Sequence, residues 1–486
     1  EDSYEFANEY KAKEVLDKYC SFMPVPIFVT NEDAGEQTEE IPEEEVTEKD
    51  TVLDTFIKDA VTEEVEKEDG TKETVEKVPA KKMAKIVKRP VAINDIHPLW
   101  TKHPNECSDE DYKEFYRKVF HDYKEPLFWI HLNMDYPFNL KGILYFPKIN
   151  TEYESIEGTI KLYNNQVFVA DNIKEVIPEF LLLLKGVIDC PDLPLNVSRS
   201  ALQNDGFVKK ISDYITKKVA DKLSGMCKTD KENYEKYWDD ISPFIKFGCL
   251  KDEKFAEKMN DYIIFKNLDG KYLTLKECLE ENKEKHENTV FYVTDEIEQS
   301  QYINMFKNEG IDAVILTHNI DQPFITNMES KNENLKFKRI DADLSDSFKE
   351  ETSKDELKDM TEKLSKTFKD ALGNENLTVS VEKLKDASIS SMITLSEESR
   401  RMQDMMKMYG MAGMDPNMFG AEGQTLVLNA NNDLVKYVAE HADGENTKII
   451  CEQLYDLAML SHAPLSPEQM TGFIARSNKI MELLAK

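Results

Sequence analysis

The sequence predicts a multidomain protein that combines the α/β and α+β classes. Its 486 residues are too many for one compact core, and 40% of them are hydrophobic, enough to fill several. Strand-like and helical runs alternate through the middle of the chain, and helical patterns dominate after it. We therefore expect two α/β sandwich units joined by helices, followed by a mostly helical C-terminal domain.

The first segment, residues 1–29, is too short to bury a core of its own. Its pattern predicts a helix from about Tyr4 to Tyr19 and a short strand, Pro26–Val29. We expect this segment to be the end of a domain that lies upstream.

An acidic stretch follows, over residues 30–90. Residues 31–50 hold ten acidic side chains and one lysine, and such a composition does not bury enough apolar surface to offset its ordering entropy. We expect a flexible charged linker. Asp69-Gly70, between two alternating stretches, offers a hairpin as the alternative.

The larger α/β unit is expected over residues 91–228. Ser108 followed by Asp111 is typical of a helix start, and this helix should run to about Phe120. Asn164-Asn165 between two β-rich runs predicts a tight hairpin. The remaining expected elements are strands at 127–134 and 142–146 and helices at 177–187 and 207–223.

A helical connector, residues 229–262, leads to the smaller α/β unit, residues 263–345. Val290–Thr294 and Ala313–Thr317 are short β-branched runs on either side of a helical stretch, which predicts two parallel strands. Lys336–Ile340 is a candidate third strand.

Residues 346–486 are expected to be mostly helical, with short strands at 377–381 and 424–428. The last helix opens with Ser466-Pro-Glu-Gln469, which combines a capping serine with proline at the first helical position. Apolar residues recur at helical spacing on the last two helices. They either pack in a core or meet a second copy of the chain.

The composition argues against several function classes. A net charge of -32 repels phosphate backbones, so nucleic acid is not an expected partner. No apolar run approaches the length that spans a bilayer. The seven cysteines show no C-x-x-C pair and the eight histidines no ligand spacing, so neither a disulfide framework nor a metal site is expected.

The segment DLPLNVSRSALQ, residues 192–203, carries the most chemical information. Pro194 breaks regular structure, and Ser198 can cap a short helix that begins at Arg199. A cation in a first helical turn does not complement the helix dipole. Arg199 therefore either serves an external phosphate or carboxylate or forms a surface ion pair with Asp192 or Asp205, and the residues alone favour the ion pair.

This segment resembles the middle-domain signature of the heat-shock protein 90 chaperones, including the bacterial HtpG type. The resemblance covers essentially the whole chain, and the acidic stretch lies where that family has a linker. Further motifs occur in the family's order: Pro98–Thr101 with Asp111–Tyr116, Gly142–Pro147, Ile160–Tyr163 with Val167–Val169, Leu184–Asp189, and Phe291–Thr294.

The resemblance implies an ATP-dependent chaperone that binds and remodels partly folded client proteins as a dimeric clamp. Residues 1–29 would then be the remnant of the N-terminal ATP-binding domain. Arg199 would reach the γ-phosphate of ATP as an arginine finger, with Asn196 and Gln203 beside it. Because no D-x-G-x-G loop occurs, ATP and Mg²⁺ are expected only in the intact protein, and this chain alone should not hydrolyse ATP.

The resemblance also implies binding surfaces. A methionine-rich stretch would bind clients, although ordinary packing or a disordered loop explains it as well. Candidate client contacts are Met405, Met406, Met408, Tyr409, Trp129 and Phe324; for the last two, core packing is the simpler explanation. The last two helices would form a homodimer. Candidate interface residues are Leu454, Leu457, Met470, Phe473, Ile474, Ile480, Met481 and Leu484.

We expect a cytoplasmic protein of the stress response, and a co-chaperone of the DnaK system is a further partner that the family implies. Two other function classes remain as alternatives. An independent α/β enzyme requires a complete substrate pocket, and the sequence shows no motif for one. An acidic scaffold without nucleotide coupling gives no reason for the Arg199 segment.

Overall fold

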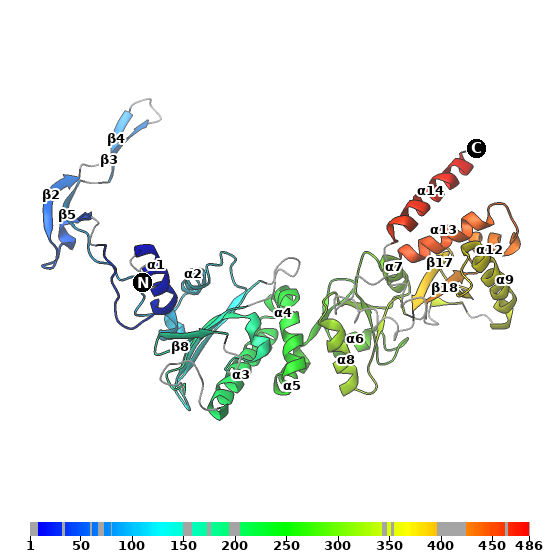
Figure 1. Cartoon of the computed structure of the whole chain (residues 1–486), viewed down its shortest axis with the longest axis horizontal. Helices are drawn as coiled ribbons and strands as arrows, with labels where there is room; N and C mark the ends of the chain where they lie inside the picture. Colours follow the sequence, from blue (N-terminus) through cyan, green and yellow to red (C-terminus); the bar gives the residue numbers. More distant parts are fainter. Residues whose placement is uncertain are drawn as a thin grey trace. The chain divides into compact units, whose positions relative to one another are not determined.

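The computed structural model describes residues 8–31, 35–58, 61–66, 72–78, 80–148, 158–172, 176–193, 205–342, 348–350, 354–395, 424–461 and 465–485. The chain divides into two compact units. Figure 1 draws the helices and strands of both. Unit 1 is Glu1–Pro178 with Leu182–Ile215, and unit 2 is Glu179–Leu181 with Thr216–Lys486. Both contain helices and strands, which confirms the prediction of a multidomain α/β and α+β protein. The finer domain bounds stay predictions.

Unit 1 begins with helix α1 (Glu9–Cys20), which is capped by the Asn8 side chain. The segment after it is extended but is not the strand expected at Pro26–Val29. Asn94 binds it instead: its Nδ2 donates to the carbonyls of Met23 (2.8 Å) and Val25 (2.9 Å). This segment is thereby fixed to residues that follow the acidic stretch.

Phe22 attaches the same segment to the core of unit 1. Its ring is 3% exposed and lies 4.7 Å from the Trp100 ring and 5.6 Å from the Tyr163 ring. The segment after α1 is too short to bury a core alone, and it contributes Phe22 to the core of unit 1.

The acidic stretch contains β-structure where the sequence predicts a flexible linker. Its antiparallel sheet has the order β1-β5-β2, and β3 and β4 form the hairpin that was the alternative prediction. The elements are β1 (Thr38–Pro42), the 3-10 helix η2 (Glu43–Glu45), β2 (Val52–Lys58), β3 (Val61–Glu66), β4 (Lys72–Val78) and β5 (Lys81–Val87). The prediction considered the acidic residues alone. In the fold, the lysines of β5 lie beside them.

The main sheet of unit 1 has the order β6-β7-β10-β8-β9, with β10 parallel to β8 and the other neighbours antiparallel. Helix α2 (Asp109–Phe120) begins at the predicted Ser108–Asp111 capping box, and its aromatic residues pack against the sheet. The strands are β6 (Phe128–Met134), β7 (Leu140–Phe146), β8 (Ile160–Asn164), β9 (Val167–Asp171) and β10 (Lys185–Asp189), and the 3-10 helices are η3 (Leu99–Thr101), η4 (Pro104–Glu106) and η5 (Glu179–Leu183).

Two local predictions in this unit are wrong. Residues 177–187 form η5 and the start of β10, not a helix, because a short apolar run fits a buried strand equally well. Gly186 allows the close packing of β10: a Cβ there would lie 2.8 Å from the carbonyl oxygen of Ile143. The hairpin turn lies one residue later than predicted, at Asn165 and Gln166, which have φ values of 50° and 62°.

Helix α3 (Asp205–Thr229) contains the boundary between the two units. Unit 2 continues with α4 (Lys231–Lys251), α5 (Glu253–Met259) and the 3-10 helix η6 (Asn260–Tyr262). A buried ion pair between Lys246 of α4 and Asp321 connects α4 to α8.

The smaller α/β unit has the predicted parallel strands, in the order β14-β13-β15. Its helix is shorter than the predicted stretch because Asp295 and Gln299 hold the residues after β13 in a turn. The elements are β11 (Ile264–Lys266), β12 (Tyr272–Thr274), α6 (Leu275–Glu281), β13 (Thr289–Val293), α7 (Ser300–Asn308), β14 (Ala313–Ile315), α8 (Asp321–Lys331) and β15 (Lys336–Arg339).

The C-terminal part combines a sheet, in the order β16-β18-β17, with the helices drawn around it in Figure 1. Strand β17 was not predicted. One buried cluster joins Phe291 and Phe306 of the smaller α/β unit to Met392 and Val427, so the core continues across the boundary predicted at residue 345. The elements are α9 (Lys354–Leu372), β16 (Thr378–Glu382), β17 (Ser391–Leu395), β18 (Gln424–Asn429), α12 (Asp433–Glu440), α13 (Thr447–Leu460) and α14 (Pro467–Leu484).

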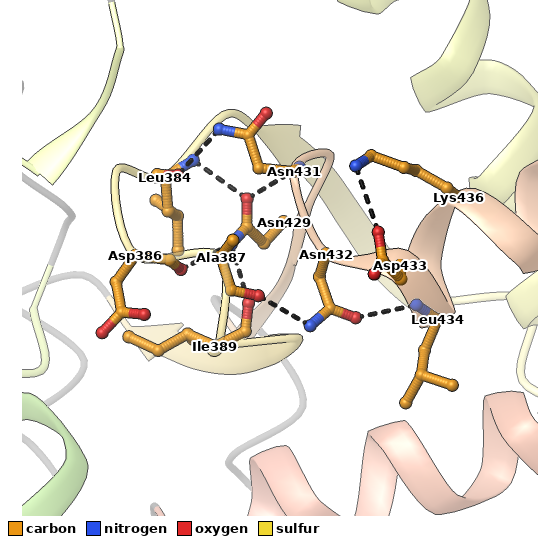
Figure 2. Close-up of polar contacts among 10 residues, drawn as sticks. All are labelled: Leu384, Asp386, Ala387, Ile389, Asn429, Asn431, Asn432, Asp433, Leu434 and Lys436. Carbon is orange, nitrogen blue, oxygen red and sulfur yellow. Dashed lines mark hydrogen bonds and ion pairs between the residues drawn. The ribbon is translucent and has the colours of Figure 1, made fainter.

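Asn429 organises the turn after β18 (Figure 2). Its side chain is fully buried; Oδ1 accepts from the amides of Leu384 and Asn431, both at 3.0 Å, and Nδ2 donates to the carbonyls of Asp386 (2.9 Å) and Ile389 (2.7 Å). A buried amide with all these bonds fixes the segment before β17 onto the end of β18.

Candidate functional site

The segment with Arg199 joins the end of β10 to the start of α3. Residues 194–204, and with them Asn196, Arg199 and Gln203, lie outside the described residues. The flanking residues on both sides are described and belong to unit 1. They show how the segment is mounted.

Asp189, the last residue of β10, forms a buried polar centre at the end of that strand. It is 6% exposed, and its Oδ2 accepts from Trp100 Nε1 (3.2 Å) and from the amide of Gln166 (3.0 Å). Burial raises the pKa of this carboxyl, and the two hydrogen bonds oppose that change. Asp189 thus connects the end of β10 to η3 and to the β8–β9 turn.

The residues after Asp189 are fixed by two asparagines. Asn164 Nδ2 donates to the carbonyl oxygens of Cys190 (3.1 Å) and Pro191 (3.0 Å). The amide of Asn139 donates to Asp192 Oδ2 at 2.7 Å. Asp192, one of the aspartates considered as a surface partner for Arg199, therefore accepts a bond from the backbone.

The other end of the segment is fixed by aromatic packing. The Phe138 ring is 4% exposed and lies 5.5 Å from Phe207 and 6.1 Å from Tyr214, both in α3. Asn139, beside Phe138, binds the opposite end of the segment, so a short stretch before β7 contacts both flanks. Both described flanks are therefore held by the same part of unit 1.

Sequence reasoning located the segment but missed the residues that hold it. Asn164 and Asn139 reach its flanks only in the folded sheet, and their spacing in the sequence gives no signal. Asp189 lies in the family motif Leu184–Asp189, but its role in holding the segment was not predicted. Trp100 was marked as part of a family motif, and its hydrogen bond to Asp189 gives that motif a structural role.

The candidate client contacts differ in whether the structure describes them and in how deeply they are buried. Met405, Met406, Met408 and Tyr409 lie outside the described residues. Trp129 is partly buried and stacks on Tyr112, with ring centroids 4.9 Å apart. Phe324 is only 2% exposed, so its ring packs inside unit 2 and is not on the surface.

The candidate interface residues fall into two groups. Leu454 is 1% exposed and lies in the core of its own chain, so it is not a surface contact in this structure, contrary to the expectation. Met470, Phe473 and Ile480 are partly buried. The exposed residues are Leu457 at 43%, Ile474 at 53%, Met481 at 58% and Leu484 at 83%.

Helix α14 is attached to α13 largely by polar groups, because none of its described side chains is buried. Arg476 Nε donates to Gln453 Oε1 at 3.0 Å, and its guanidinium forms ion pairs with Asp456 and, at 3.4 Å, Glu452. Burial raises the pKa of Asp456, and the charge of Arg476 acts against that rise. Arg476 therefore joins the two candidate dimer helices.

Within the described part of the chain, no helix is both long and apolar enough to cross a membrane. The described residues also contain no cluster of three or more histidine, cysteine or acidic side chains suited to holding a metal ion.

Comparison with known proteins gives a consistent result. The family model described as Hsp90 protein matches residues 5–486. A chaperone protein HtpG of Bacteroides thetaiotaomicron is 38% identical over 91% of this chain, and one of Porphyromonas gingivalis is 36% identical over 90%. A chaperone protein HtpG of Borrelia garinii is 27% identical over 99% of the chain. These alignments cover 60%, 59% and 71% of the respective relatives, so the chain spans about 60% of the length of the first two.

Proposed function

The chain belongs to the Hsp90 protein family, and we propose that it is the client-binding and dimerisation part of an ATP-dependent molecular chaperone. The intact protein would bind and remodel partly folded client proteins as a homodimeric clamp. The observation that carries this proposal is the family match over residues 5–486, which includes the Arg199 segment between β10 and α3.

Arg199 is proposed to complete the ATPase site, with Asn196 and Gln203 as its neighbours. A guanidinium suits the charge that develops on a transferring phosphoryl group. Support comes from the flanks of the segment, where Asp189, Asn164 and Phe138 fix both ends. The ATP and Mg²⁺ of the intact protein are assigned to a part of it outside this chain.

The role of Arg199 is tested in the intact protein with Arg199→Ala. We expect the ATP turnover rate to fall at least tenfold, in line with arginine fingers elsewhere, while ATP affinity changes less than threefold. Arg117→Ala is the matched control, since Arg117 is a unit 1 arginine whose ion pair with Glu110 is exposed. An equal loss of turnover and affinity would assign Arg199 to ATP binding instead.

A second test uses this chain by itself, which should not hydrolyse ATP. Measurable turnover that purifies with the chain and disappears in Arg199→Ala would favour the independent α/β enzyme.

Clients are proposed to contact the methionine-rich stretch around Met405 to Tyr409, and alanine substitutions there should weaken binding of an unfolded model protein. Cytoplasmic location and cooperation with the DnaK system complete the proposal.

A further inference from the structure

The parallel pairing of β8 and β10 ends just before the Arg199 segment begins. The last paired residues are Tyr163 of β8 and Asp189 of β10. One more backbone bond follows, from the amide of Cys190 to the carbonyl of Tyr163 at 3.1 Å. Strand β8 itself ends at Asn164 and turns toward β9. The chain that leaves β10 therefore passes beyond the end of its neighbouring strand.

The side chain of Asn164 continues the attachment past this point. Its Nδ2 donates to the carbonyl oxygens of Cys190 at 3.1 Å and Pro191 at 3.0 Å. A primary amide has two N–H groups, and here both are used on consecutive residues of one segment. The direction in which the chain leaves β10 is thereby fixed over two peptide units.

The turn after β8 fixes the orientation of the Asn164 amide. Asn165 Nδ2 donates to Asn164 Oδ1 at 3.3 Å. The opposite orientation would direct Oδ1 at two carbonyl oxygens, which cannot donate. Asn165 and Gln166, with φ values of 50° and 62°, form the two-residue turn that holds Asn165 in place. The amide of Gln166 donates to Asp189 Oδ2 at 3.0 Å, so this turn is also attached to β10.

Asn164 differs from the other groups that hold the same flank. Asn139 acts through its backbone amide, which a side-chain substitution leaves in place. Asp189 also accepts from Trp100, which belongs to the buried aromatic core of unit 1, so its loss would disturb that core. Asn164 is partly buried and is not a member of the core cluster. Its loss should therefore release the flank while the core stays folded.

We propose that Asn164 is a positioning residue for Arg199, which it serves by fixing Cys190 and Pro191. This inference rests on the proposed role of Arg199 in ATP hydrolysis. Asn164 acts through the chain and not by contact with the nucleotide. The effect on the rate is large because a misplacement of about 1 Å at a reacting centre lowers a rate by up to about 100-fold.

The test measures ATP turnover by the intact protein with two substitutions at Asn164. Asn164→Leu has a similar size and removes both donors, and Asn164→Asp keeps the acceptor for Asn165 without the donors. Asn172→Gly, at the other end of the β8–β9 hairpin, is the matched control. The Asn172 side chain accepts from the amide of Ile160 (2.8 Å) and donates to the carbonyl of Gly158 (3.1 Å). Glycine tolerates its φ of 50°.

Both substitutions at Asn164 should lower kcat about tenfold, while the KM for ATP changes less than about twofold. Asn172→Gly should leave both constants within about twofold of wild type. The discriminating measurement adds each Asn164 substitution to Arg199→Ala. Because Asn164 acts through Arg199, the added substitution should then lower kcat less than about twofold further.

Hydrogen exchange of peptides from β7 is expected at the wild-type rate in every variant, since the core of unit 1 stays folded. Faster exchange in both Asn164 variants would assign Asn164 to stability and overturn the proposal. A wild-type kcat in both, or an equal fall of kcat with and without Arg199, would overturn it as well. A wild-type kcat in Arg199→Ala alone would instead contradict the proposed function, and this inference with it.

Discussion

Arg476 is predicted to control dimer affinity without belonging to the apolar surface that would form the dimer. Its side chain points to α13, where it contacts Gln453, Glu452 and Asp456. The exposed apolar residues of α14, among them Ile474 and Met481, carry the proposed interface. If Arg476 sets how α14 lies on α13, its loss should disturb that interface indirectly.

The magnitude follows from the burial of the contacts. The side chains of Arg476, Asp456 and Glu452 are 14%, 13% and 30% exposed, so the pairs are neither surface pairs nor fully buried. Hydrogen bonds to charged groups contribute about 1.5–3 kcal/mol each in protected sites, and partial solvation lowers that value. We assign about 2 kcal/mol to the docking of α14, which corresponds to about 30-fold in an equilibrium constant.

The perturbation is Arg476→Met, which keeps the apolar stem and removes the charge. The dimer dissociation constant, from sedimentation velocity on a dilution series, should rise about 30-fold. Lys479→Met is the control on the same helix, because Lys479 pairs only locally with Glu482 at 3.7 Å; it should change the constant less than twofold. Asp456→Asn together with Arg476→Met should cost less than the sum of the two single changes.

A dissociation constant within threefold of wild type for Arg476→Met would refute the reasoning, because α14 would then be oriented by its partly buried residues alone. A wild-type chain that is monomeric at every concentration would refute the homodimer proposal itself. The two outcomes are distinguishable, since the second is visible before any variant is made.

Two further predictions concern buried polar groups. Asp189→Asn removes a carboxyl whose burial raises its pKa. Such a group costs wild-type stability as the pH rises above its unfolded value of 3.8, so urea unfolding of the two proteins should shift in favour of the variant as the pH is raised from about 4. No change in that difference with pH would contradict a raised pKa. Asn429→Ala leaves the buried partners of the Asn429 side chain unpaired and should lower the free energy of unfolding by about 3 kcal/mol. Asn432→Ala, which removes an exposed helix cap, should cost about 1 kcal/mol, and guanidinium unfolding titrations of both asparagine variants measure the two losses.

Local signals in the sequence predicted the elements whose cause is local. The Ser108 and Ser466 capping boxes set the starts of α2 and α14, and both helices begin at the predicted residues. The parallel strands β13 and β14 were also predicted, because β-branched runs around a helix have few other arrangements. These features depend on residues that are close in the chain.

Features that depend on distant residues were missed. Residues 177–187 were predicted as a helix because nothing nearby reveals that Gly186 pairs with Leu144 of β7, with the Ile143 carbonyl close to where its Cβ would be. The acidic stretch read as a linker because its stabilising partners, Lys81, Lys82 and Arg89, come more than thirty residues later. The residues that mount the Arg199 segment were missed for the same reason.

Charged pairs attach peripheral elements of this chain, whereas apolar burial holds its cores together. Arg89 pairs with Asp50 of the acidic stretch and Arg476 joins α14 to α13, whereas the clusters around Phe291 and Leu426 are apolar. Apolar burial is non-directional and does not depend on paired charges, so it suits parts that stay together. Charge-assisted pairs with partial solvent access are directional and reversible, and they weaken with ionic strength. The proposed homodimeric clamp would require this second kind of attachment where its parts separate. Under that proposal, Arg476 is a position where α14 can detach from α13 without loss of the apolar cores.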